Sequence, residues 1–94
     1  MTVKALRAEI TKIDLQIIDL IADRQKISGK IAQAKMNEGL PIHDLKRTRE
    51  VLEIAFTAAV EKNINPVSIQ KIFEVLIEMS EERQRECSGE GNLP

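Results

Sequence analysis

The sequence has few aromatic residues, one cysteine and one histidine, and each shortage excludes a class of site. Aromatic residues make up 2% of the 94 residues and both are phenylalanine, so the stacking surfaces that hold single-stranded nucleic acids are missing. The single cysteine, Cys87, rules out an internal disulfide and suits a reducing compartment such as the cytoplasm. Because His43 is the one histidine, no metal site is expected.

Charge and hydropathy argue against two further kinds of partner. A net charge of −1 and an isoelectric point near 5.8 provide no basic field for nucleic acid. No apolar run approaches the roughly 20 residues that a membrane span needs, and residues 1–20 are amphipathic rather than signal-like. We therefore expect one cytoplasmic domain that binds neither nucleic acid nor membrane.

Apolar residues recur at intervals of three and four, which predicts an all-α fold of one long and two shorter helices. The expected helices run from about Val3 to Met36, from Leu45 to about Lys62 and from Pro66 to about Glu86. Their expected N-caps are Thr2, Asp44 and Asn65. Residues 37–43 form a turn containing glycine and proline, and residues 88–94 are expected to be a flexible tail after a domain of residues 1–87.

The length of the first helix predicts a dimer. About 34 helical residues extend about 50 Å, whereas a compact chain of this size is only about 32 Å across. The two shorter helices cannot cover the apolar stripe along its whole length. A second copy of the chain is the simplest cover, so we expect a homodimer.

Polar residues interrupt each apolar stripe where a core would hold leucine. In the first helix Arg24 and Lys35 lie in the stripe, about three turns and about 16 Å apart on one side. In the third helix Ser80 and Gln84 prolong the stripe. Taken singly, an arginine or lysine usually reaches to the helix edge, a serine only packs, and Asp44 is only a cap. Together they imply an anionic ligand, because buried cations without partners are costly.

The order and spacing of these residues resemble the all-helical chorismate mutases. The resemblance covers about residues 5–85, and no other catalytic arrangement of side chains competes with it. The matching residues are Leu6-Arg7, Ile10, Ile13-Asp14, Ile17-Ile18, Leu20, Arg24, Ile31, Lys35, Gly39, Pro41-Ile42, Asp44, Arg47, Ile72-Phe73, Ile77, Ser80 and Gln84.

The resemblance implies a role for each polar residue. Lys35 and Gln84 would donate to the ether oxygen of the breaking bond, and Arg24 would be the third catalytic residue. The substrate-binding set would be Arg7, Arg24, Lys35, Asp44, Arg47, Thr48, Ser80 and Gln84, in which the arginines and the serine hold carboxylates and Asp44 contacts the ring hydroxyl. Thr48 stands where the family usually has glutamate.

Arg7 belongs to this site only in a dimer. It lies about 25 Å from Arg24 and about 42 Å from Lys35 along the helix axis, and it points about 100° away from Arg24. The family's interlocked antiparallel homodimer would bring Arg7 of one chain to the site of the other.

The implied activity is the [3,3] rearrangement of chorismate to prephenate in phenylalanine and tyrosine biosynthesis, without a cofactor. Two alternatives remain open at this point. An isochorismate-pyruvate lyase shares the fold and the basic pocket, and parallel assays on the two substrates would discriminate. A non-catalytic helical dimerisation module would tolerate leucine at the polar positions.

Overall fold

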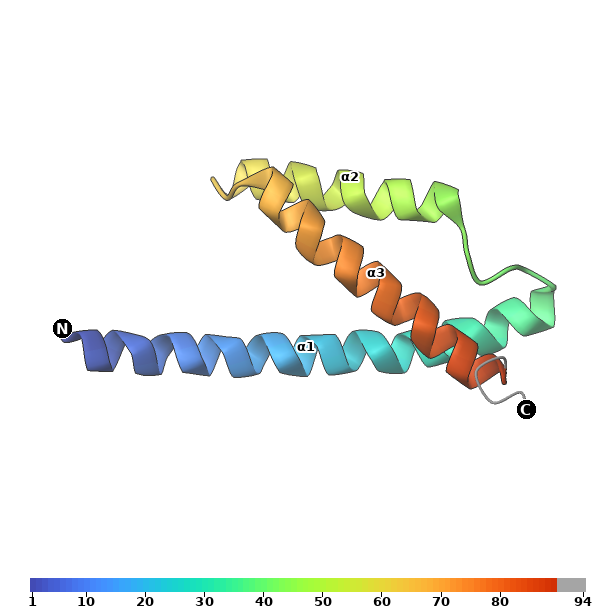
Figure 1. Ribbon diagram of the computed structural model, residues 1–94, viewed down its shortest axis with the longest axis horizontal. Helices are drawn as coiled ribbons and strands as arrows, with labels where there is room; N and C mark the ends of the chain where they lie inside the picture. The colour runs from blue at the N-terminus through green and yellow to red at the C-terminus, as the bar shows by residue number, and fades with distance from the viewer. Residues whose placement is uncertain (90–94) are drawn as a thin grey trace.

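The computed structural model describes residues 1–89 and contains three helices (Figure 1). Helix α1 spans Val3–Glu38, α2 spans Leu45–Glu61 and α3 spans Pro66–Ser88. Within these residues there is no strand, so the predicted all-α fold with one long and two shorter helices is confirmed. In the same part of the chain no helix is long and apolar enough to cross a membrane.

Each helix begins directly after the residue predicted to cap it. The Thr2 side chain accepts a hydrogen bond from the backbone N–H of Ala5 at 3.1 Å. Asp44 Oδ1 accepts from the N–H of Arg47 at 3.1 Å, and Asn65 Oδ1 accepts from two N–H groups in the first turn of α3. These caps satisfy amide groups that have no partner inside the helix, so they fix where α2 and α3 start.

Two helices run further than the sequence predicted. Asn37 and Glu38, expected in the turn, belong to α1, because the helix ends only where Gly39 adopts a left-handed conformation with φ of 67°. The next amide, of Leu40, bonds the carbonyl of Lys35 at 2.8 Å, which completes a Schellman motif. Ser88, expected in the tail, is the last residue of α3, and residues 90–94 of that tail lie outside the described residues.

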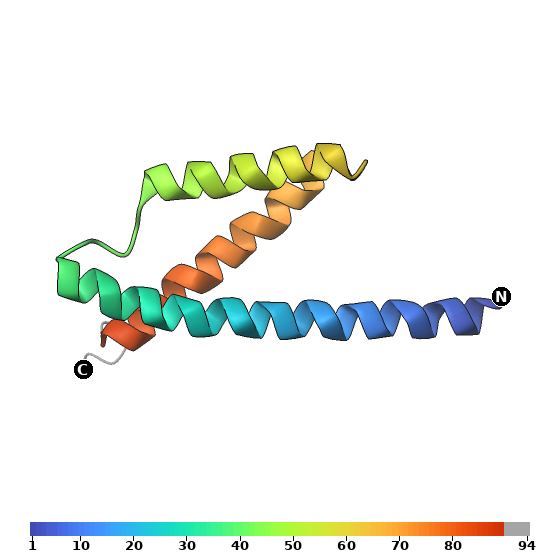
Figure 2. The same cartoon turned by 180° about the vertical axis from the view of Figure 1, so that it is seen from behind.

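The helices form an open frame and not a compact bundle. Helix α3 packs against α2 at one end and against the C-terminal part of α1 at the other, while α1 and α2 do not pack together (Figures 1 and 2). The described chain measures 54 × 27 × 20 Å, and its radius of gyration is 16.5 Å. A compact domain of this length has a radius of gyration near 12 Å.

The openness leaves apolar side chains uncovered on the long helix. The N-terminal half of α1 extends away from α2 and α3, and its predicted stripe is exposed in the single chain. The exposed positions include Leu6, Ile10, Ile13, Ile17 and Leu20, with relative exposures between 42% and 64%. The few buried apolar residues are Ala32, Ala55, Ala59 and Leu76. A single chain therefore buries little of the surface that should stabilise it.

Candidate active site

A cavity of about 470 Å³ lies between the three helices, and it collects most of the residues singled out in the sequence. Seven of the eight predicted substrate-binding residues line it: Arg24, Lys35, Asp44, Arg47, Thr48, Ser80 and Gln84. Arg7 does not, because it lies in the free N-terminal half of α1. The polar positions of the separate stripes thus converge on one cavity.

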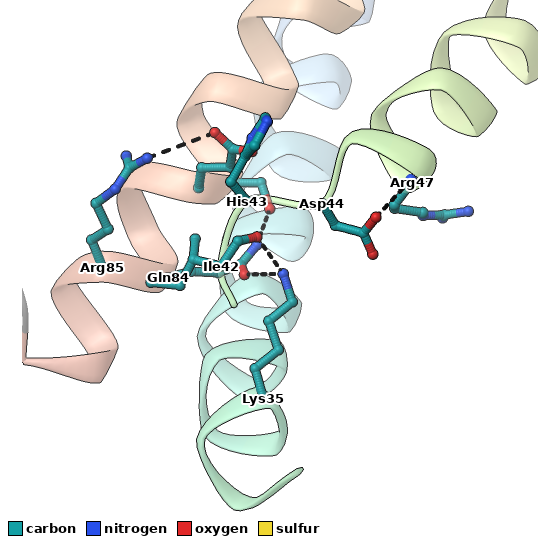
Figure 3. A network of polar contacts seen from close by, with 9 residues as sticks. Lys35, Ile42, His43, Asp44, Arg47, Gln84 and Arg85 are labelled. Atoms are coloured by element: carbon teal, nitrogen blue, oxygen red, sulfur yellow. Dashed lines mark hydrogen bonds and ion pairs between the residues drawn. The ribbon is translucent and has the colours of Figure 1, made fainter. Parts of the chain in front are cut away.

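Lys35 is held at this cavity by two neutral oxygens. Its Nζ donates to the backbone carbonyl of Ile42 at 2.6 Å and to Gln84 Oε1 at 2.8 Å (Figure 3). An ammonium group has three N–H donors, so one remains for a ligand. No carboxylate among residues 1–89 forms an ion pair with it. The charge of Lys35 is therefore positioned without being neutralised.

Gln84 is oriented by hydrogen bonds at both ends of its amide. Its side chain is almost fully buried, with 5% of the residue exposed. Oε1 accepts from Lys35, and Nε2 donates to Ser80 Oγ at 3.1 Å. Ser80 Oγ in turn shares a hydrogen bond of 2.7 Å with Ser28 Oγ, which is also buried. The second N–H of Gln84 Nε2 has no hydrogen-bond partner among the described residues, so it retains the capacity to donate to a ligand.

Arg24 is attached to α3 by contacts that also leave its charge available. Its Nη1 donates to the carbonyl of Leu76 at 3.4 Å, and its guanidinium carbon lies 6.0 Å from the centre of the Phe73 ring. Both contacts are with neutral groups. The remaining N–H donors of the guanidinium form a planar fork, which matches the geometry of a carboxylate.

The first turn of α2 supplies the third side of the cavity. Asp44 is both a cap and a lining residue, because Oδ1 bonds the N–H of Arg47 while Oδ2 has no hydrogen bond from residues 1–89. The guanidinium of Arg47 makes only a loose, exposed contact with Glu50 at 3.4 Å. Thr48 is half-buried at the cavity. The cap and the site are therefore compatible interpretations of Asp44.

Two contributors were missed in the sequence. Glu81 lines the cavity from α3, one residue after Ser80 and one turn before Gln84, but its charge did not stand out in a strongly charged helix. The carbonyl of Ile42 holds Lys35. Every residue has a backbone carbonyl, so the residue type gives no sign that this one acts as an acceptor. Three cations and two carboxylates line the cavity, so its side chains favour an anion.

The cations and amide donors that converge on this cavity define a helical protein with a binding site for a small anion. Comparison with known proteins identifies its family. The sequence model of chorismate mutase type II matches residues 6–85. The chain therefore belongs to the chorismate mutase type II family, and the resemblance drawn from its sequence is confirmed.

Individual relatives agree with this assignment. A protein named chorismate mutase from Methanocaldococcus jannaschii is 31% identical over 81 residues, which are 86% of this chain and 82% of that protein. A bifunctional chorismate mutase/prephenate dehydratase of Buchnera aphidicola subsp. Schizaphis graminum is 34% identical over 76 residues. The match covers 81% of this chain and 20% of that protein, so the chain spans about a fifth of the length of such bifunctional relatives.

A solved structure is also similar. A conserved hypothetical protein from Pyrococcus furiosus has 41% sequence identity and a TM-score of 0.73, over 90% of this chain and 97% of that chain.

The serine pair gives a test of the hydrogen-bond network. Ser80→Ala removes the acceptor of Gln84 Nε2 and the partner of Ser28, whereas Ser28→Ala leaves the Gln84 bond intact. We expect Ser80→Ala to lower the free energy of unfolding by about 1 kcal/mol more than Ser28→Ala, because it leaves more buried polar atoms unsatisfied. Denaturant unfolding at one protein concentration measures both. Equal costs, or a larger cost for Ser28→Ala, would contradict the network.

Proposed function

We propose that this protein catalyses the rearrangement of chorismate to prephenate. The observation that carries the proposal is the geometry of Lys35, whose ammonium is fixed beside the Gln84 amide and retains an unused donor. The family assignment and the convergence of Arg24 and Arg47 on the same cavity support it. The reaction breaks one C–O bond and forms one C–C bond within a single dianion.

No proton moves in that chemical step, so the site needs neither a general acid nor a general base. It must first hold the flexible dianion in a compact shape, a task for arginines on the two carboxylates. It must then stabilise the negative charge that grows on the ether oxygen. In our proposal Lys35 and Gln84 donate their unused N–H groups to that oxygen, in a cavity where both are already oriented.

The remaining lining residues complete the proposed substrate contacts. Ser80 helps to hold a carboxylate, which is consistent with its place between Ser28 and Gln84. Asp44 accepts a hydrogen bond from the ring hydroxyl through Oδ2, because the helix cap uses Oδ1. Thr48 lines the same cavity, so its hydroxyl contributes a further hydrogen bond to the substrate.

We propose that the active unit is an antiparallel, interlocked homodimer. The apolar side chains along the N-terminal half of α1 are exposed, and neither α2 nor α3 of the described chain packs against them. Because α1 is one continuous helix, Arg7 lies about 25 Å from Arg24 along the axis and cannot reach the cavity of its own chain. In the proposed dimer, Arg7 of the partner subunit supplies a further cation for a substrate carboxylate.

Prephenate is a precursor of aromatic amino acids, so we place the enzyme in phenylalanine and tyrosine biosynthesis. The free thiol of Cys87 fits the reducing cytoplasm, which we propose as its compartment.

Replacing Lys35 tests its role in the chemical step. We expect Lys35→Ala to lower kcat about 10²-fold or more while KM changes little, because the contact strengthens in the transition state. Steady-state assays on chorismate measure both constants. The matched control is Lys30→Ala, an exposed lysine on the same helix, which should retain wild-type kinetics. A rise in KM with unchanged kcat would reduce Lys35 to a binding residue.

Mixing two inactive variants tests the shared site. Arg7→Ala and Lys35→Ala homodimers should both be nearly inactive. A heterodimer pairs the intact Arg7 of one chain with the intact Lys35 of the other, which rebuilds one active site. The second active site of the same dimer then lacks both side chains. Equal mixing with subunit exchange should restore about a quarter of wild-type activity. If exchange is demonstrated independently and no activity returns, Arg7 does not act across the interface.

A further inference from the structure

We propose that His43 and Glu81 form a clamp that positions the Lys35 ammonium for catalysis. The inference rests on the proposed function and deepens it, because it assigns a role to two residues outside the predicted set. His43 lies in the segment that joins α1 to α2, and Glu81 lies on α3. Both are positioning residues, since they act on Lys35 through the backbone of Ile42.

The clamp is a short hydrogen bond between the connecting segment and α3. His43 Nδ1 lies 2.8 Å from Glu81 Oε1. Because a carboxylate only accepts, the imidazole nitrogen is the donor. The Glu81 side chain is 19% exposed, so its end of the bond is partly shielded from water, whereas the His43 side chain is 64% exposed. The other neighbour of Glu81, the Arg85 guanidinium, is at 3.8 Å and contributes little.

The residue next to His43 is the one that holds Lys35. The carbonyl of Ile42 accepts from Lys35 Nζ at 2.6 Å (Figure 3). Within residues 1–89, the His43–Glu81 bond is the one hydrogen bond that links residues 40–43 to α3, and the remaining bonds of this segment go to α1. Since α1 and α2 do not pack together, the hydrogen bonds that hold Ile42 near Gln84 in the described chain are the His43–Glu81 bond and the bridge made by Lys35 itself.

The clamp also occupies a carboxylate that lines the cavity. Glu81 precedes Gln84 by three residues on α3, so the two side chains are neighbours on the helix surface and both line the cavity. No ion pair joins Glu81 to Lys35 in residues 1–89, where Oε1 of Glu81 is bonded to His43 and Oε2 lies near Arg85. Breaking the clamp therefore removes the support of Ile42 and loosens the Lys35 ammonium.

Kinetics and chemical labelling of variants test the clamp together. We expect His43→Ala and Glu81→Ala each to lower kcat about tenfold with KM changed much less, because a small displacement of a catalytic donor is costly. The double variant should be no slower than the slower single variant, since both changes break one device. His43→Asn should retain most activity, because its amide nitrogen reaches about as far as Nδ1. Arg85→Ala is the matched control and should retain wild-type kcat.

Labelling with acetic anhydride, read by mass spectrometry, reports on Lys35 without any turnover. We expect His43→Ala to raise the labelling rate of Lys35 several-fold while that of Lys30 stays unchanged. Unchanged labelling of Lys35 in His43→Ala would overturn the clamp, as would additive losses of kcat in the double variant. If the wild type fails to convert chorismate but Lys35 is still released in His43→Ala, the proposed function is wrong and the clamp stands.

Discussion

The site depends on one hydrogen-bonded group, the Lys35 ammonium bound by the carbonyl of Ile42 and the amide oxygen of Gln84. These three residues come from α1, from the segment after it and from α3, so this one group joins two helices of the cavity to the segment that leads into α2. Both acceptors are neutral. They therefore fix the direction of the ammonium group while leaving its charge for an anion, which is the condition for electrostatic catalysis.

The second constraint is the mismatch between a long helix and a short chain. Helix α1 buries its C-terminal part against α3 and leaves its N-terminal stripe of isoleucine and leucine exposed. The same half carries Arg7, far from its own cavity. The apolar stripe and the separated arginine both favour a second copy as the missing component, so stability and catalysis would share one interface.

The sequence predicted the elements better than it predicted their contacts. Capping side chains and the period of three and four are local, so the starts of all three helices were correct. The end of α1 was placed too early, at about Met36, because the helix continues to Glu38 and ends where Gly39 adopts the left-handed conformation. Four cavity residues, Arg24, Lys35, Ser80 and Gln84, could be predicted from polar interruptions of apolar stripes, whereas Arg47 and Thr48 entered the predicted set through the family resemblance. The carbonyl of Ile42 and the position of Glu81 could not, because they depend on how the connecting segment folds against α3.

Binding of a transition-state analogue measures the central claim, that the Lys35 charge is reserved for the ether oxygen, most directly. The probe is a bicyclic dicarboxylate ether that mimics the compact dianion, titrated calorimetrically into the wild type and into Lys35→Met, which keeps most of the apolar stem. We predict one analogue per chain for the wild type and a Kd about 10²-fold weaker for Lys35→Met. Equal affinities for the two proteins would contradict the account, because the ammonium would then contribute nothing to the ligand that resembles the transition state.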